Sequence, residues 1–193
     1  MSRHPIFPLG SVLFPGGPLQ LRIFERRYLD MVTRCLREDL GFGVCLIADG
    51  REVGVPATPC PIGTLARIID WNTLPDGLLG ITAIGGERFR LDQTERGENG
   101  LLWADVELIA SVPAPPLPEQ PKELSALLDQ IFALEGLGYE HVRRNEDDPH
   151  WLSWRLAEVL PISPEDKYAL LALDDPYQRL TILRQVVPSI RID

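Results

Sequence analysis

The fold of this chain is decided by residues 7–28, which read FPLGSVLFPGGPLQLRIFERRY. The apolar run Val12 to Phe14 stops at the Pro-Gly-Gly-Pro sequence of residues 15–18. Proline fixes φ and removes a backbone donor, whereas glycine permits a positive φ, so this sequence predicts a turn. Leucine and isoleucine then alternate with polar residues over residues 19–23, the pattern of a half-buried strand. The stretch therefore predicts a turn that leads into a strand.

A helix is predicted to follow that strand directly. Over residues 28–36, apolar side chains recur at three- and four-residue spacing, and charged side chains occupy the other face. Gly41 is expected to cap its C-terminal end. We expect Phe24 and Tyr28, four residues apart, to anchor this helix to the strands. Two pairs have the spacing of ion pairs on one helix face: Arg26 with Asp30, and Arg34 with Glu38.

Short apolar runs separated by turn signals continue to residue 112. Strands are predicted over residues 42–47, 62–71, 78–84, 87–91 and 101–112. Three prolines in residues 53–61 predict a loop there, and Leu74-Pro75-Asp76-Gly77 predicts a hairpin turn. Gly85 and Gly86 are predicted to form a second β-turn.

The composition changes at Pro113. Residues 113–121, PAPPLPEQP, hold five prolines in nine residues and predict a semi-rigid linker. Four helices are expected beyond it, over residues 124–134, 150–160, 167–173 and 177–187. The sequence therefore predicts an α+β fold with a β-rich subdomain (residues 1–112), a linker (113–121) and an α-helical subdomain (122–193).

Residues 7–32, FPLGSVLFPGGPLQLRIFERRYLDMV, resemble the opening signature of the Lon protease N-terminal (substrate-binding) domain family. In that signature a proline-flanked apolar strand, a second strand and an IFE-R-Y helix start follow one another. Residues 42–46, 62–64 and 86–89 resemble later strands of the family in the same order. The resemblance spans roughly the whole chain. It implies a PUA-like β-barrel followed by a helical bundle, used to recognise protein substrates or partners.

Charge and apolar content restrict the partners. The 28 acidic and 19 basic residues give a net charge of −9, whereas nucleic-acid binding depends on basic surface. RNA binding, which other PUA-like barrels show, is therefore disfavoured, and we expect no nucleic-acid partner. No stretch has the length of a membrane span or of a secretion signal, and the three cysteines form no C-x-x-C pair. We expect a cytoplasmic protein without a membrane partner.

An ATPase or peptidase would require motifs that the sequence does not contain. There is no G-x-x-x-x-G-K-[ST] sequence, and neither of the two lysines, Lys122 and Lys167, occupies such a position. Both lie in local cap or helix contexts, so neither is assigned as the base of a Ser-Lys site. The chain is therefore expected to be non-enzymatic, to use no ATP, and to resemble a stand-alone member of the family without ATPase and peptidase domains.

No catalytic, cofactor or metal site is assigned. His141 and His150 lie among carboxylates, but nine residues apart, and an exposed interhelical loop is the favoured interpretation. Cys60, between two prolines, is the cysteine expected to be exposed. Trp151 and Trp154 either pack in the core or form a partner-facing patch, and they are the peptide-binding candidates.

The sequence is compatible with two functions. The favoured one is a module that binds unfolded or partner polypeptides, by strand addition at a sheet edge or in an apolar groove between the subdomains. The alternative is a small-molecule-binding protein or hydrolase with a site between the subdomains. That alternative requires Glu140, His141 and His150 to converge in one pocket.

Overall fold

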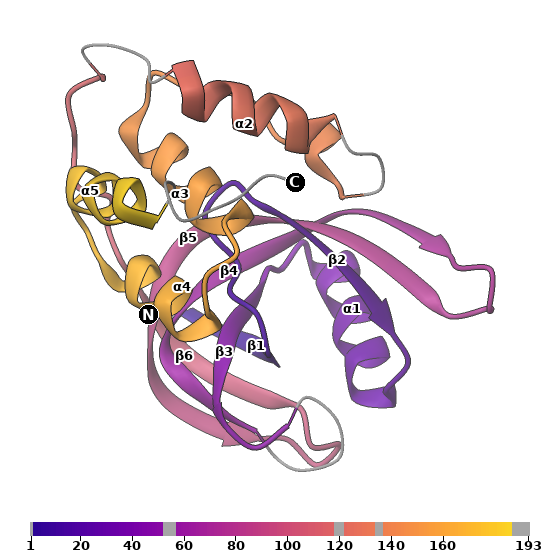
Figure 1. Ribbon diagram of the computed structural model, residues 1–193. Helices are drawn as coiled ribbons and strands as arrows, with labels where there is room; N and C mark the ends of the chain where they lie inside the picture. The colour runs from indigo at the N-terminus through magenta and orange to yellow at the C-terminus, as the bar shows by residue number, and fades with distance from the viewer. Residues whose placement is uncertain (1, 52–56, 118–121, 134–136, 187–193) are drawn as a thin grey trace.

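The computed structural model describes residues 2–51, 57–117, 122–133 and 137–186 (Figure 1). Its strands are β1 (Ser2–Leu9), β2 (Pro18–Ile23), β3 (Phe42–Asp49), β4 (Thr58–Thr73), β5 (Leu79–Arg96) and β6 (Leu102–Leu108). Its helices are α1 (Arg26–Glu38), α2 (Lys122–Phe132), the 3-10 helix η1 (Tyr139–His141), α3 (Pro149–Val159), α4 (Pro164–Ala172) and α5 (Pro176–Val186). This content confirms the predicted α+β class.

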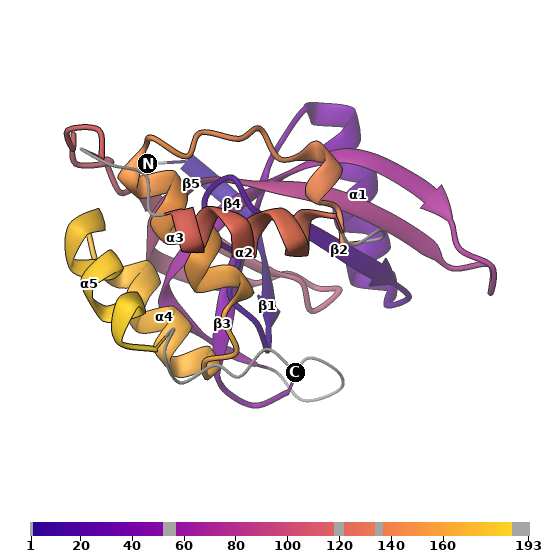
Figure 2. The same ribbon diagram turned by 45° about the horizontal axis from the view of Figure 1, so that its top comes forward.

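The strands pair in the order β2-β5-β4-β3-β1-β6, and β5 also pairs with β6. Five of the strands therefore close into a ring, and β2 is attached to the ring through β5. In Figure 1, α1 lies apart from α2 to α5, and in both views the β4–β5 hairpin projects from the body (Figures 1 and 2). No helix of the described residues is long and apolar enough to cross a membrane.

Strand β1 was missed by the sequence analysis. It contains Pro5 and Pro8, and proline removes a donor from a β-ladder. The structure accommodates both prolines because β1 changes partner along its length. Residues 2–6 pair with β6, and residues 6–9 pair with β3. Each proline therefore lies in a part of β1 that has a strand on one side only.

The Pro-Gly-Gly-Pro turn is confirmed, with Gly16 at a φ of 73°. The residues before it, Val12 to Phe14, form no strand and instead lead into the turn. The phenyl ring of Phe14 is fully buried in the core of the helical part, where it stacks on Trp154 at a centroid distance of 5.6 Å. The turn region thus belongs to both parts of the molecule.

Gly85 and Gly86 form no turn, contrary to the prediction. β5 runs through both residues. The Gly16 N–H donates to the Gly85 carbonyl at 2.7 Å, and the Gly85 N–H donates to the Gly17 carbonyl at 2.8 Å. A Cβ atom on Gly85 would lie 2.3 Å from the carbonyl oxygen of Phe14. The glycine is needed because the turn packs directly on the strand.

Helix α1 confirms two predictions and corrects two. The expected ion pairs are present, at 3.2 Å for Arg26–Asp30 and 2.9 Å for Arg34–Glu38. Tyr28 anchors the helix by stacking on Phe7 at 3.8 Å. Phe24 does not, because it is 53% exposed. The helix ends at Glu38 and is capped by Asp39, which adopts a φ of 49°, and not by Gly41.

The hairpin turn at residues 74–77 is confirmed, with Gly77 at a φ of 84° and its N–H bonded to the Leu74 carbonyl at 2.8 Å. The predicted loop at 53–61 ends earlier than expected, because β4 begins at Thr58. Residues 52–56 of that loop lie outside the described residues.

Four α-helices follow β6 in the described residues, as predicted. Asp148 caps α3 by accepting from the His150 N–H, and Ser163 caps α4 by accepting from the Asp166 N–H. Both helices have proline in the first turn. The predicted linker lies between the end of β6 at Leu108 and the start of α2 at Lys122, and its residues 118–121 lie outside the described part.

Candidate functional site

Strand β2 has one free edge. It pairs with β5 over residues 18–23 and with no other strand of the described residues. In an antiparallel pair, the backbone groups of successive residues point alternately toward the partner strand and away from it. The carbonyl of Gly17 points toward β5, because it accepts from the Gly85 N–H. The N–H and C=O groups of Gln20 and Arg22 therefore point toward the free edge.

A crevice of about 180 Å³ lies on one face of this edge; it is mainly apolar, and its charged lining residues are Arg22 and Glu25, the latter paired with Arg27. Leu21 and Ile23 of β2 face it, since alternate residues of a strand share a face. Its other apolar walls come from β1, from α1 and from the residues between β2 and α1: Phe7, Leu9, Phe24 and Tyr28. Phe24, which is not anchored in the core, thus borders the crevice.

An open trough of about 460 Å³ lies on the opposite face of the edge. Gly138, which precedes η1, packs against Pro18 and Gln20 and so brings η1 to this face. The polar lining comes from four elements: Gln20 and Arg22 of β2, Thr82 of β5, Asp70 and Asn72 of β4, and Glu140 and His141 of η1. Gln20 and Arg22 border both the crevice and the trough.

The trough carries an excess of negative charge. Arg22 forms an ion pair with Asp76 of the β4–β5 turn. Asp70 and Glu140 form no ion pair with a lysine or arginine of the described residues, and Glu140 contacts His141 at 3.6 Å. Two carboxylates on this side of the edge therefore have no lysine or arginine partner among the described residues.

Trp154, one of the two predicted binding candidates, lies in the core. It is 5% exposed, and the guanidinium carbon of Arg179 lies 3.4 Å from its ring centroid. Trp151 is half-buried and packs edge-on against Phe132 at 6.2 Å. The structure therefore supports core packing for Trp154, and it does not bring the two indoles together as an exposed patch.

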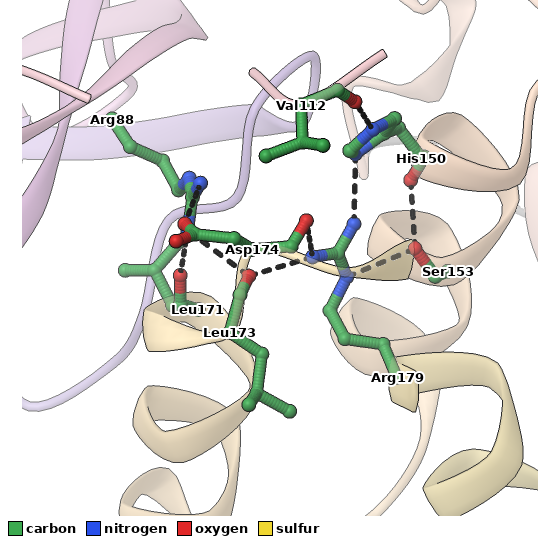
Figure 3. Close-up of polar contacts among 8 residues, drawn as sticks. All are labelled: Arg88, Val112, His150, Ser153, Leu171, Leu173, Asp174 and Arg179. Carbon is green, nitrogen blue, oxygen red and sulfur yellow. Dashed lines mark hydrogen bonds and ion pairs between the residues drawn. The ribbon is translucent and has the colours of Figure 1, made fainter. Parts of the chain in front are cut away.

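Arg179 of α5 is the centre of a buried polar cluster (Figure 3). It donates to the Ser153 hydroxyl at 3.0 Å and to the Leu173 carbonyl at 2.7 Å. A third bond, of 2.9 Å, runs to Nδ1 of His150. Burial and the nearby charge of Arg88 lower the pKa of the Arg179 guanidinium to about 9. The surrounding acceptors offset this cost of burial.

The same cluster connects the helices to the strands. Arginine has no acceptor, so Nδ1 of His150 accepts from Arg179, and Nε2 of His150 carries the proton. That Nε2–H donates to the carbonyl of Val112 at 2.6 Å. Arg88 of β5 donates to the Leu171 carbonyl at 2.8 Å and to Asp174 at 2.7 Å (Figure 3). We assign this cluster a structural role, in which it joins the helices to β5 and to the segment that follows β6.

A second buried cluster ties the turn to α3. Arg155 is fully buried, donates to the Pro15 carbonyl at 2.8 Å and pairs with Glu158 at 2.8 Å. Glu158 also accepts from the Tyr139 hydroxyl at 3.0 Å, and its backbone carbonyl accepts from Lys167 at 2.7 Å. Burial lowers the pKa of Arg155 and raises that of Glu158, whereas the contact between them favours both charged forms.

The residues that the enzyme alternative required do not converge. Glu140 and His141 belong to η1, and Glu140 faces the trough. His150 belongs to the Arg179 cluster, where both of its ring nitrogens are engaged. No group of three histidine, cysteine or carboxylate residues suited to a metal ion occurs among the described residues.

The three cysteines differ in their environment. Burial raises the pKa of all three thiols, that of Cys35 to about 11, but Cys35 and Cys45 are buried whereas Cys60 is only half-buried and so more accessible. Because the thiolate is the reactive form, we expect iodoacetamide at pH 8 to label Cys60 first in the native protein and all three residues in urea. Mass spectrometry would measure the labelling. Equally fast native labelling of Cys35 or Cys45 would contradict the described burial, and Cys60→Ser is the control.

The free edge was not found by sequence reasoning. The alternation of residues 19–23 predicts a strand, but the number of its neighbours depends on long-range pairing. Pro18 offered one signal, because a proline at the start of a strand is typical of an edge. Gln20 was therefore missed as a candidate site residue.

Comparison with known proteins identifies the family. Residues 3–187 match the model of the ATP-dependent protease La (LON) substrate-binding domain. A Lon N-terminal domain protein from Xanthomonas campestris is 36% identical, with a TM-score of 0.76 over 96% of this chain and 98% of that one. The N-terminal domain of the Mycobacterium avium complex Lon protease shares the fold, at 16% identity and a TM-score of 0.68 over 98% of this chain and 100% of that one.

A full Lon protease is also similar. The Lon protease of Cytophaga hutchinsonii is 25% identical over 199 residues, which cover 95% of this chain and 24% of that protein. The chain thus spans about a quarter of the length of this relative. With the family model matched over almost all of its length, the chain belongs to the ATP-dependent protease La (LON) substrate-binding domain family.

Proposed function

We propose that this protein is a non-enzymatic module that binds extended polypeptide segments at the free edge of β2. One observation carries the proposal: the backbone groups of Gln20 and Arg22 point toward an open edge, between an apolar crevice and a polar trough. An extended peptide adds to such an edge through main-chain hydrogen bonds, and pockets for its alternate side chains provide selectivity.

Two further features support a polypeptide partner. The family is described by substrate binding, and in a protease the substrate is a polypeptide. The net charge of −9 opposes a nucleic-acid partner. Addition of a peptide to this edge requires no rearrangement of the five-strand ring, because β2 is not one of the strands that close it.

The edge can be tested with Gln20→Pro. Proline at this position removes one N–H that points outward and leaves the ladder to β5 intact. Gln20→Ala is the matched control, because it removes the same side chain and keeps the N–H. Loss of one main-chain hydrogen bond is expected to weaken binding of an unfolded, reduced and alkylated model protein by about tenfold.

Binding would be followed by fluorescence anisotropy, with circular dichroism to verify that each variant is folded. Alanine is expected to change the affinity by less than about twofold, since it leaves the main-chain bond in place. Undetectable binding by the folded wild-type protein would refute the proposed function. Equal affinities of the proline and alanine variants would refute the edge as the place of binding.

A further inference from the structure

A strand added to β2 would present its side chains to two different surfaces. Residues opposite Gln20 and Arg22 would share the trough face, because opposite residues in a sheet lie on one side of it. The residue between them would point to the other face, beside Leu21 and above the crevice. Alternate positions of the added strand therefore face the polar trough and the apolar crevice.

From this geometry we infer that the edge selects segments in which a large apolar residue lies between two polar ones, with a basic residue beside Gln20. The inference rests on the proposed function and adds the chemical class of the bound segment. It names a side-chain pattern that can be tested separately from binding itself.

The apolar requirement comes from the crevice. Its walls include Leu21, Tyr28 and the ring of Phe24, which is 53% exposed. A side chain inserted there would remove apolar surface from water on both partners, which favours binding. At about 180 Å³ the crevice has room for one large side chain. It therefore selects the side chain at one position of the bound segment.

The basic requirement comes from charge complementarity in the trough. Arg22 is neutralised by Asp76, whereas Glu140 has no lysine or arginine partner among the described residues. Glu140 lies two residues after Gly138, which packs on Gln20, so η1 enters the trough beside Gln20 and contributes Glu140 to its lining. Asp70 on the trough wall adds negative charge. A lysine or arginine on the added strand would supply the missing cation.

Three blocked nine-residue peptides would test the pattern, with central sequences Lys-Leu-Lys, Glu-Leu-Glu and Lys-Ser-Lys. Fluorescence anisotropy at low salt would measure their affinities. We expect Lys-Leu-Lys to bind about two- to fivefold tighter than Glu-Leu-Glu, as for exposed ion pairs. Lys-Ser-Lys is expected to bind about tenfold more weakly than Lys-Leu-Lys, because it buries no large apolar side chain.

Two pairs of variants make the test specific. Glu140→Gln is expected to remove most of the preference for lysine. Glu165→Gln makes the same change in net charge at an exposed residue of α4 and should retain the preference. Phe24→Ala is expected to reduce the preference for leucine, whereas Leu36→Ala, at another exposed apolar residue, should not.

The possible failures are distinguishable. If all three peptides bind equally and Gln20→Pro weakens each of them, the inferred pattern is wrong and the proposed edge stands. If Glu140→Gln and Glu165→Gln reduce the lysine preference equally, the preference reflects net charge and the inferred role of Glu140 is wrong. If Gln20→Pro changes no affinity, both the edge and the pattern are refuted.

Discussion

Replacement of Arg179 by methionine is expected to lower the free energy of unfolding by about 2 to 4 kcal/mol. Methionine fills a similar space but donates no hydrogen bond, so Ser153, His150 and the Leu173 carbonyl each lose a buried donor. The contact with the Trp154 ring at 3.4 Å is lost as well. Urea unfolding followed by tryptophan fluorescence and circular dichroism would measure the change.

One effect acts in the opposite direction. The pKa of Arg179 is lowered to about 9 because burial disfavours its charge, and methionine removes that cost. The acceptors around the guanidinium are themselves buried and would remain unpaired, so we expect the loss to dominate. A methionine variant as stable as the wild type would show that removal of the buried charge compensates for the lost hydrogen bonds. Arg184→Met on the same helix is the control, because Arg184 is exposed and should change stability by less than about 0.5 kcal/mol.

Replacement of Gly85 by alanine is expected to cost about 1 to 3 kcal/mol, the range for overpacking. The added Cβ would lie 2.3 Å from the Phe14 carbonyl oxygen, which is a backbone atom and cannot rotate away. The turn must therefore move off β5, and its bonds to Gly85 at 2.7 and 2.8 Å must lengthen. Equilibrium unfolding in urea would give the change.

Gly86→Ala provides a neighbouring control on the same strand. The nearest atom to a Cβ there is the Leu65 carbonyl oxygen at 3.4 Å, an ordinary contact, and the residue is exposed. We expect a change of less than about 0.5 kcal/mol. Equal costs at the two positions would mean that general strand propensity, and not the approach of the turn, explains the requirement for glycine.

The features predicted from sequence are those with local causes. The starts of α3 and α4 follow from Asp148-Pro149 and Ser163-Pro164, where cap and proline act within one helical turn. The alternation in β2 follows from its half-burial. The sequence also indicates the substrate-binding family, because residues 7–32 carry its signature within a single continuous segment.

The features missed depend on residues far apart in the chain. Gly85 was expected to form a turn because two glycines often do, and only the packing of Phe14 explains the continuous strand. Phe24 was expected to be buried from its spacing to Tyr28, but the crevice leaves it exposed. Pro18 is a local sign that β2 lies at an edge, but the candidate site came from the strand order, which shows that β2 has no second neighbour among the described residues.

The position of β1 has a consequence for synthesis on the ribosome. Residues 2–6 leave the ribosome well before their partners on β6, which are residues 102–106. At a translation rate of about 5 to 20 residues per second, β6 is synthesised roughly 5 to 20 s after β1, and the ring cannot close before then. The bond from Arg155 to the Pro15 carbonyl forms later still, across 140 residues. Until then the nascent chain exposes an unpaired strand edge, a state in which chaperone binding would compete with aggregation.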